Sequence, residues 1–428
     1  MDHSLIDDWT VEGESRLHRR AVPQQRAPLI LTRYTLVSAL GNGLDQTFQA
    51  LRNRRSGLRP CDFEDVGITA YIGRVDDVED GPFHGSSASA ELGQFDCRNN
   101  RLALLGLRQD GFIPAAMAAR ERYGTHRVAV ILGSSTSGIL ETEHAYSHRD
   151  PVTGALPSSY LQSYRYTQNM FSSAHFVRAY LGLRGPAMVI STACSSSAKI
   201  FATAARFIEA GFCDAVVVGG VDSLCLTTLY GFASLGVMSQ GPCRPCDEER
   251  DGLTLGESAG FGLLEKSEHV GCSGAVALLG YGESSDGYHM SHPHPEGTGA
   301  IRAMQAALQR SGLTSEDIDY IHLHGTATRT NDSIEDTAVH SVFGPSTPCS
   351  STKGWMGHTL GAAGITGAVI AAMCLTRSFL PGTLNTTRID PTLGSHVLLR
   401  NRDQPVRRVL SNSFGFGGNN CSLIFGTV

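Results

Sequence analysis

Cys194 is the residue in this sequence whose setting best suits a nucleophile. An apolar, strand-like run at 187–190 is followed by a turn of small residues, by Cys194 itself, and then by a segment with helical apolar spacing that ends near Gly211. This pattern places the thiol on a strand-to-helix turn. Unpaired N–H groups at a helix start carry partial positive charge, so they favour the nucleophilic thiolate. A free cysteine is as often a small buried residue, and this stretch alone leaves both interpretations open.

Three later motifs follow strand-like runs, and open parallel sheets place their ligands at such strand ends. They are HGTAT at 324–328 with Glu335 soon after, STKGWMGH at 351–358, and the glycine-rich NSFGFGGNN at 412–420. A single histidine after a strand is usually structural. Two histidines beside glycine, His324 and His358, in a chain that also has a candidate nucleophile, favour a catalytic site.

The composition is that of an ordinary globular protein. Of its 428 residues, 41% are hydrophobic and 18% are charged, which is enough for one large core or two fused halves. The net charge of −6 gives no sign of nucleic-acid binding. We find no apolar run of membrane-spanning length and no signal peptide, so we expect no membrane insertion and a cytoplasmic location. The odd number of cysteines, eleven, indicates reduced thiols.

Strands and helices alternate along the chain in two series. Residues 1–26 are polar and aperiodic, which is typical of an extension. A first half at 27–270 carries the candidate nucleophile, and a second half at 271–428 carries both histidines. In the first half we expect strands at 29–40, 128–132, 187–190 and 215–218, helices at 102–120, 174–183 and after Cys194, and irregular structure at 61–100 and 134–173.

The second series begins near Gly274. It predicts strands at 275–279, 319–323, 349–352, 408–411 and 421–425, and helices at 300–311, 334–343 and 360–379. The alternation indicates an α/β fold with a mostly parallel sheet covered on both faces. Two similar series suggest an internal duplication.

Taken in order, the motifs resemble those of the beta-ketoacyl-[acyl-carrier-protein] synthases of the thiolase superfamily. Cys194 stands in TACSSSA, His324 in HGTAT, and Lys353 and His358 in STKGWMGHTLGAAG, ahead of the glycine-rich NSFGFGGNN. Each motif is modestly specific, but four in the right order make a chance resemblance very unlikely. The resemblance implies a duplicated thiolase-like fold, with two mixed, mostly parallel sheets and helices in layers (αβαβα).

The resemblance also implies a reaction. Family members hold an acyl chain as a thioester on the cysteine and extend it with two carbons from malonyl-acyl-carrier protein, releasing carbon dioxide. Cys194 would carry the acyl group. Neutral His324 and His358 would donate hydrogen bonds to the malonyl thioester carbonyl and stabilise the enolate, although one of them could instead activate a water.

Further positions match supporting residues of the family. The backbone N–H groups of Cys194 and Phe416 match its oxyanion hole, and Phe416 also matches its gate residue beside the acyl tunnel. Lys353 and Glu335 match an ion pair near the two histidines. The hydroxyls that bind the pantetheine arm match Thr326 and Thr328.

The resemblance implies partners but no resident cofactor. Phosphopantetheine would arrive on the acyl-carrier protein, and relatives pair through the strand before the nucleophile, so we expect a homodimer or a heterodimer with a homologous subunit. Cys243 and Cys246 have CxxC spacing, and three histidines lie in one loop at 289, 292 and 294. The cysteines lack a second pair, and histidines in a loop rich in glycine and proline are more often solvated, so we expect no metal.

The sequence departs from the family pattern in three places. Arg329 stands where many relatives carry proline, and Ser258 where glycine is usual. No Lys or Arg lies between Arg206 and Arg244, a region that in several relatives supplies a basic contact for the acidic carrier. We therefore expect a docking surface that is shifted or shared with another subunit.

Four classes of function differ in the residues that they require. The Cys-His-His set favours an elongating condensing enzyme, whereas a thiolase would use a second cysteine and a starter-unit synthase would carry asparagine at one histidine. A chain-length-factor-like partner subunit usually lacks the nucleophile. A cysteine hydrolase would need an Asp or Asn that orients a histidine. Whether the pathway makes fatty acids, polyenes or polyketides is not readable from these residues.

Overall fold

The computed structural model describes residues 28–79, 90–270 and 273–428. The polar extension at 1–26 lies outside the described residues. Strands from both halves of the chain join in one 12-stranded sheet. The first half contributes five neighbouring strands in the order β1 (Leu29–Ser38), β9 (Ser258–Lys266), β7 (Ala215–Asp222), β5 (Val128–Gly133) and β6 (Ala187–Ile190). Its sixth strand in this sheet, the short β2 (Gly41–Asn42), pairs with the end of β1.

The second half continues the sheet from the other edge of β1. Two residue pairs, Leu29 with Leu278 and Ile30 with Ala277, join β1 to β10. The order then runs through β10 (Val276–Ser285), β17 (Asn419–Thr427), β16 (Arg408–Gly415), β11 (Tyr320–His322), β12 (Pro348–Ser350) and β14 (His396–Val397). The two expected sheets are therefore the two halves of one continuous sheet, joined at the pairing of β1 with β10.

The sheet is mixed, as expected, and its parallel pairs lie toward the two edges. In the first half β5 pairs in parallel with β6 and β7, and in the second half β11 pairs in parallel with β12 and β16. The strands at the middle, from β7 through β16, are antiparallel. Every residue of β5 and β7 is buried, which is typical of strands covered on both faces.

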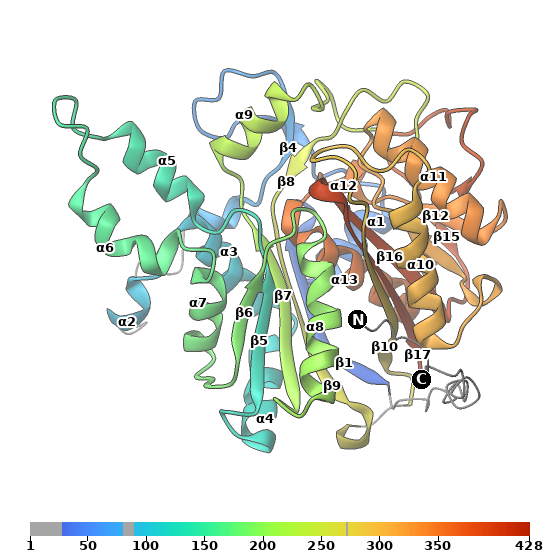
Figure 1. The fold of residues 1–428 in the computed structure, drawn as a ribbon, viewed down its shortest axis with the longest axis horizontal. Helices are drawn as coiled ribbons and strands as arrows, with labels where there is room; N and C mark the ends of the chain where they lie inside the picture. The colour runs from blue at the N-terminus through green and yellow to red at the C-terminus, as the bar shows by residue number, and fades with distance from the viewer. Residues whose placement is uncertain (1–27, 80–89, 271–272) are drawn as a thin grey trace, which may run out of the picture.

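Two helices lie between the halves of the sheet. α8 (Ser196–Glu209) packs against β5 and β7 of the first half and β17 of the second, and α13 (Ala363–Arg377) packs against β16 and β9. Figure 1 shows both at the centre of the molecule. Gly364 allows the two helices to touch, because a Cβ there would lie 2.1 Å from the backbone nitrogen of Ala198.

Further helices cover the outer faces. α3 (Arg98–Leu107), α4 (Phe112–Tyr123) and α7 (Ser172–Tyr180) pack on the first half, and α10 (Thr298–Ser311) packs on β10 and β17 of the second with α11 (Arg329–Phe343) beside it. Helices and sheet halves thus form the expected αβαβα layers.

One stretch corrects the expectation of no membrane-length apolar run. Residues 360–377 form a helical stretch of 18 residues with mean hydropathy 1.5, which is long and apolar enough to span a membrane. However, 83% of this stretch is buried inside the fold, where it forms the central helix α13 and the turn before it. Its all-round apolarity is that of a core helix.

Several expected elements have different bounds. The helix expected at 102–120 is two helices, because Asp110 and Gly111 both have positive φ, 52° and 69°. The region 134–173, expected to be irregular, contains α5 (Ile139–Ser147) and α6 (Ser158–Thr167). These helices are largely exposed and polar, so their sequences lack the apolar periodicity by which a helix is predicted. Strand β9 and α9 (Leu226–Ser234) were not expected either.

Candidate active site

Cys194 lies on the strand-to-helix turn that the sequence predicted. The edge strand β6 ends at Ile190, and α8 begins at Ser196. Ala193 turns the chain with a φ of 52°, and the Cys194 residue is only 6% exposed. The thiol therefore faces the interior at the N-terminal end of the central helix.

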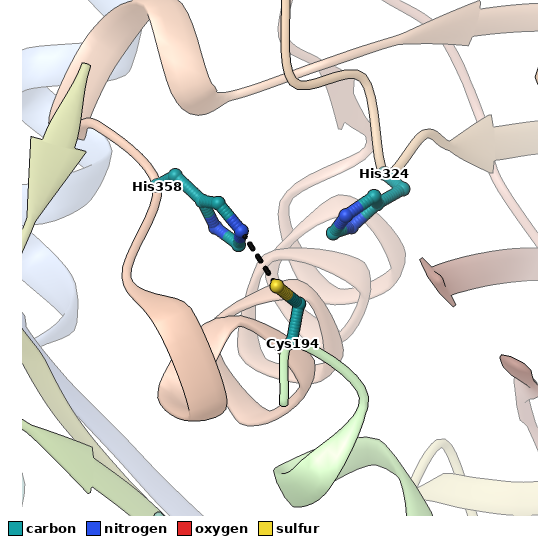
Figure 2. Close-up of side chains that lie close together, drawn as sticks. All are labelled: Cys194, His324 and His358. Carbon is teal, nitrogen blue, oxygen red and sulfur yellow. Dashed lines mark hydrogen bonds between the residues drawn. The ribbon is translucent and has the colours of Figure 1, made fainter. Parts of the chain in front are cut away.

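Both predicted histidines converge on this thiol. One ligand atom from each of Cys194, His324 and His358 can be chosen so that all three lie within 4.8 Å of one another. His358 Nε2 is 3.0 Å from Cys194 Sγ, and the two imidazole rings stand edge to face with centroids 5.3 Å apart. Figure 2 shows the sulfur below and between the rings, which come from separate loops of the second half.

The thiol has a raised pKa, whereas the argument from the helix start favours a thiolate. Burial raises the pKa of Cys194 to about 11, although the Lys353 charge and a hydrogen bond from the Phe416 backbone N–H oppose this. The partial charge of the helix start is therefore outweighed by loss of solvent. Deprotonation needs a base, and His358 Nε2 is within hydrogen-bond distance.

His324 follows β11 and is held by charged residues. The Glu335 carboxylate accepts hydrogen bonds from the backbone N–H groups of His324 and Gly325, both at 2.7 Å. Lys353 Nζ donates to the His324 carbonyl and lies 3.4 Å from His324 Nδ1. A donor at Nδ1 leaves the imidazole proton on Nε2, so His324 presents an N–H group to the site.

Lys353 and Glu335 do not form the expected direct ion pair. Within the described residues no nitrogen of Lys353 lies within 4.0 Å of a Glu335 oxygen, and each side chain instead grips the peptide around His324. Both are buried, and burial raises the pKa of Glu335 to about 7 while it lowers the pKa of Lys353. The two side chains still interact electrostatically, since the charge of each affects the pKa of the other.

His358 is positioned by backbone contacts. Its N–H donates to the Thr254 carbonyl at 2.7 Å, and its carbonyl accepts from the Gly256 N–H at 3.0 Å. Gly256 is required here, because a Cβ would lie 2.2 Å from the carbonyl oxygen of Met356. Nδ1 of His358 has no hydrogen-bond partner among the described residues.

Both imidazoles are neutral. Burial, followed by the charge of Lys353, holds the pKa values of His324 and His358 well below their usual range. Neutral imidazoles can donate from one nitrogen and accept at the other, which is what carbonyl binding and proton transfer require.

Asp222, which the sequence reading missed, ties the nucleophile side of the site to the His358 side. Its buried carboxylate accepts hydrogen bonds from Ser134, Ser135 and Thr136 after β5, and from the Gly361 N–H shortly after His358. The available signal was a carboxylate at the end of the buried run VVVGGVD, residues 216–222. A charge in such a place needs several partners.

The glycine-rich segment after β16 closes over the thiol. The backbone N–H groups of Phe416 and Cys194 both lower the pKa of the thiol, although burial outweighs them. Gly415 permits this approach, since a Cβ there would lie 2.8 Å from the Thr192 carbonyl oxygen, and Gly417 has a φ of 77°. The half-buried Phe416 ring packs against Phe232 of α9, with centroids 5.7 Å apart.

A cavity of about 150 Å³ leads to the thiol. Its lining includes all three converging residues, Phe416, and both expected threonines. The hydroxyls of Thr326 and Thr328 lie 2.9 Å apart. Other polar residues of the lining include Thr330 and Asn331.

The structure also bears on possible metal ligands. Within the described residues, Cys194, His324 and His358 are the one group of three ligating side chains close enough to share an ion. Cys243 and Cys246 are buried without a third ligand of this kind, and the Cys243 thiol lies 3.2 Å from the Lys353 carbonyl. His289 and His292 contact each other through Nδ1 atoms 3.1 Å apart, on an exposed loop.

Known proteins are similar to this chain in sequence and in fold. The family model for the N-terminal domain of beta-ketoacyl synthases matches residues 32–269, and the model for the C-terminal domain matches residues 275–387. The chain therefore belongs to the beta-ketoacyl synthase family of acyltransferases.

Particular relatives agree with this assignment. The chain is 31% identical to 3-oxoacyl-[acyl-carrier-protein] synthase 2 of Vibrio cholerae, over 93% of this chain and 98% of that protein. It is 42% identical to the enzyme of the same name from Rhizobium meliloti, over 56% of this chain and 61% of that protein. A chain of the ketosynthase and chain length factor complex from Xenorhabdus doucetiae superposes with a TM-score of 0.83 at 37% identity, covering 94% of this chain and 98% of that one.

Proposed function

We propose that this chain catalyses decarboxylative Claisen condensation, joining a Cys194-bound acyl group to malonyl-acyl-carrier protein to give 3-oxoacyl-acyl-carrier protein. The observation that carries the proposal is the convergence of one thiol and two neutral imidazoles at the end of a cavity. Each of these groups has a distinct task in the reaction, and together they account for every bond that changes.

The first step is transfer of the acyl group to Cys194. The thiol gives its proton to His358 Nε2 as the sulfur attacks the thioester carbonyl of the acyl-carrier protein. The bond between that carbonyl and the pantetheine sulfur breaks, and the departing sulfur takes the proton from His358. The backbone N–H groups of Cys194 and Phe416, which both lower the pKa of the thiol, bind the oxyanion of this step in our proposal.

The second step forms the nucleophilic carbon. The carbon–carboxylate bond of the malonyl group breaks, carbon dioxide leaves, and its bonding electrons form an enolate on the thioester. N–H donors from His324 and His358 hold the enolate oxygen, and Lys353 fixes the donating tautomer of His324. The enolate carbon then attacks the Cys194 thioester, the carbon–sulfur bond breaks, and the Cys194 sulfur takes up a proton from solvent.

The partners follow from this reaction. An acyl-carrier protein brings both substrates on its phosphopantetheine arm, with Thr326 and Thr328 binding the arm, so the chain needs no organic cofactor or metal of its own. A second subunit, either a copy of this chain or a homologue, pairs along the edge strand β6. The complex of a similar ketosynthase with its chain length factor supports the heterodimer.

Two further parts of the proposal concern role and location. The complete set of Cys194, His324 and His358 supports a condensing subunit over a chain-length-factor-like subunit, which usually lacks the nucleophile. A cytoplasmic location is supported by the described cysteines, all of which are free thiols.

Mass spectrometry of the acylated protein tests the proposal. We expect incubation with acyl-carrier proteins bearing different acyl groups to add one acyl mass at Cys194, and malonyl-carrier protein to discharge it as the 3-oxoacyl product. Cys61→Ala provides a matched control, because Cys61 is a half-buried thiol outside the site. Acylation at any other cysteine, or an adduct that malonyl-carrier protein leaves unchanged, would overturn the proposal.

A further inference from the structure

Two segments, the second of which carries three histidines, line one side of the cavity. Residues 226–242, which include α9, and residues 287–295, in the loop after β10, contain no Asp, Glu, Lys or Arg. Yet they expose large apolar side chains: Tyr230 is 45% exposed, Leu235 55%, Tyr288 56% and Met290 79%. Soluble proteins rarely gather such side chains around an active-site entrance without a partner that covers them.

The two segments meet at the glycine-rich segment that carries Phe416 and Gly417. Phe232 of α9 packs on the Phe416 ring, and the Gly417 N–H donates to the Met290 carbonyl at 2.7 Å. Leu235 on one segment and His292 on the other line the cavity itself. The exposed apolar side chains therefore border one opening, and we call Tyr230, Leu235, Tyr288 and Met290 the apolar rim.

One arginine borders the same opening from the second half of the chain. Thr328 and Thr330 line the cavity, and Arg329 between them is exposed at the first residue of α11. Its guanidinium makes no hydrogen bond or ion pair with the described residues, whereas most arginines near this face are paired, such as Arg388 with Glu248. Figure 1 shows α9 and α11 both in the upper part of the view.

We propose that the acyl-carrier protein docks on the apolar rim, with Arg329 binding the phosphodiester that links its pantetheine arm. This inference rests on the proposed function, which sends the arm through this mouth to Cys194. The phosphodiester is the one anionic group of the arm, and guanidinium groups bind phosphate oxygens with two parallel N–H donors. Apolar contacts replace the basic ones that residues 207–243 lack.

Three acyl donors distinguish the contribution of Arg329 from that of the apolar rim. Acyl-carrier protein has the protein, the phosphate and the arm; free acyl-phosphopantetheine lacks the protein; acyl-pantetheine lacks both protein and phosphate. We expect Arg329→Gln to raise KM for Cys194 acylation about tenfold with the first two donors and to leave acyl-pantetheine unchanged. Arg407→Gln is the control, since Arg407 is an exposed arginine just before β16, about 25 Å from the gate end of that strand.

The apolar rim has its own variant. Met290→Asp places a charge where the carrier should make apolar contact, so KM should rise about tenfold for acyl-carrier protein alone. Phe212→Asp is the control, because Phe212 is 61% exposed but lies beyond the C-terminal end of α8, opposite Cys194. Because few charges take part, raising NaCl from about 50 to about 500 mM should change the wild-type KM less than about threefold.

The outcomes are distinct. If Arg329→Gln affects acyl-carrier protein but not free acyl-phosphopantetheine, Arg329 contacts the carrier's own side chains and the phosphate assignment is wrong. If neither Arg329→Gln nor Met290→Asp changes any KM, the docking surface lies elsewhere. If the wild-type protein loads none of the three donors, the proposed function itself fails, and the docking surface falls with it.

Discussion

His324 and His358 face the same sulfur but are held in opposite ways. Charged side chains hold His324: Glu335 accepts a hydrogen bond from its backbone N–H, and Lys353 Nζ lies next to its carbonyl oxygen and its ring Nδ1. His358 is held by backbone bonds alone, and its Nδ1 has no partner among the described residues. His324 is therefore fixed as an N–H donor, while His358 is able to carry its proton on either nitrogen. The first arrangement suits enolate binding, and the second suits proton transfer.

Removing the shared sulfur gives the largest expected effect. Cys194→Ala should lower condensation by more than about 10⁴-fold, because the nucleophile is lost. Decarboxylation of malonyl-carrier protein should continue, since both imidazoles and their supports are intact. Carbon dioxide release and product mass measure the two steps separately. Condensation that persists in this variant would show that another residue carries the acyl group.

Removing each ring in turn tests the division of labour between them. His324→Ala and His358→Ala should each slow decarboxylation about 10²- to 10³-fold, the effect of one lost oxyanion donor. Only His358→Ala should also slow acyl loading, by about 10²-fold, because it removes the base beside the thiol. Rapid-quench loading of Cys194 distinguishes the two variants. Equal loading rates would contradict the separate roles.

The motifs were predictable because each is local in sequence. The position of Cys194 after β6, and of His324 after β11, followed from apolar periodicity and from the rule that ligands gather at strand ends. The central helices were predictable for the same reason, because their apolar residues recur over several turns.

The supports of the site were not predictable in this way. Asp222 acts through partners 86 to 139 residues away, which no local pattern reports. The resemblance suggested an ion pair for Glu335. Its carboxylate instead binds backbone N–H groups ten and eleven residues earlier. An ion pair and backbone binding leave the same residue in the sequence, so only the structure distinguishes them. The thiol pKa likewise depends on burial, which the helix-start argument omitted.

Lys353 connects the two sides of the comparison through pH. Its charge is the second cause, after burial, of the lowered pKa values of both histidines. In Lys353→Met those values should rise, so each imidazole becomes protonated and inactive at a higher pH than in the wild type. We expect the acid side of the decarboxylation profile to move to higher pH, and the rate at the plateau to fall about tenfold because the donor to His324 is lost. An unshifted profile would show that burial alone keeps the rings neutral.

Substituting Thr326 should give the smallest effect, and it tests whether the residues that fix His324 extend to the substrate-binding wall. It lies two residues after His324, and its hydroxyl bonds that of Thr328 in the cavity wall. Thr326→Val removes one neutral hydrogen bond, which is worth about 1 kcal/mol, so KM for malonyl-carrier protein should rise about fivefold with kcat nearly unchanged. Thr337→Val, on an exposed part of α11, is the control. A fall in kcat instead would mean that Thr326 positions His324. The set of residues that fixes His324 would then include Thr326 in the cavity wall as well as Glu335 and Lys353.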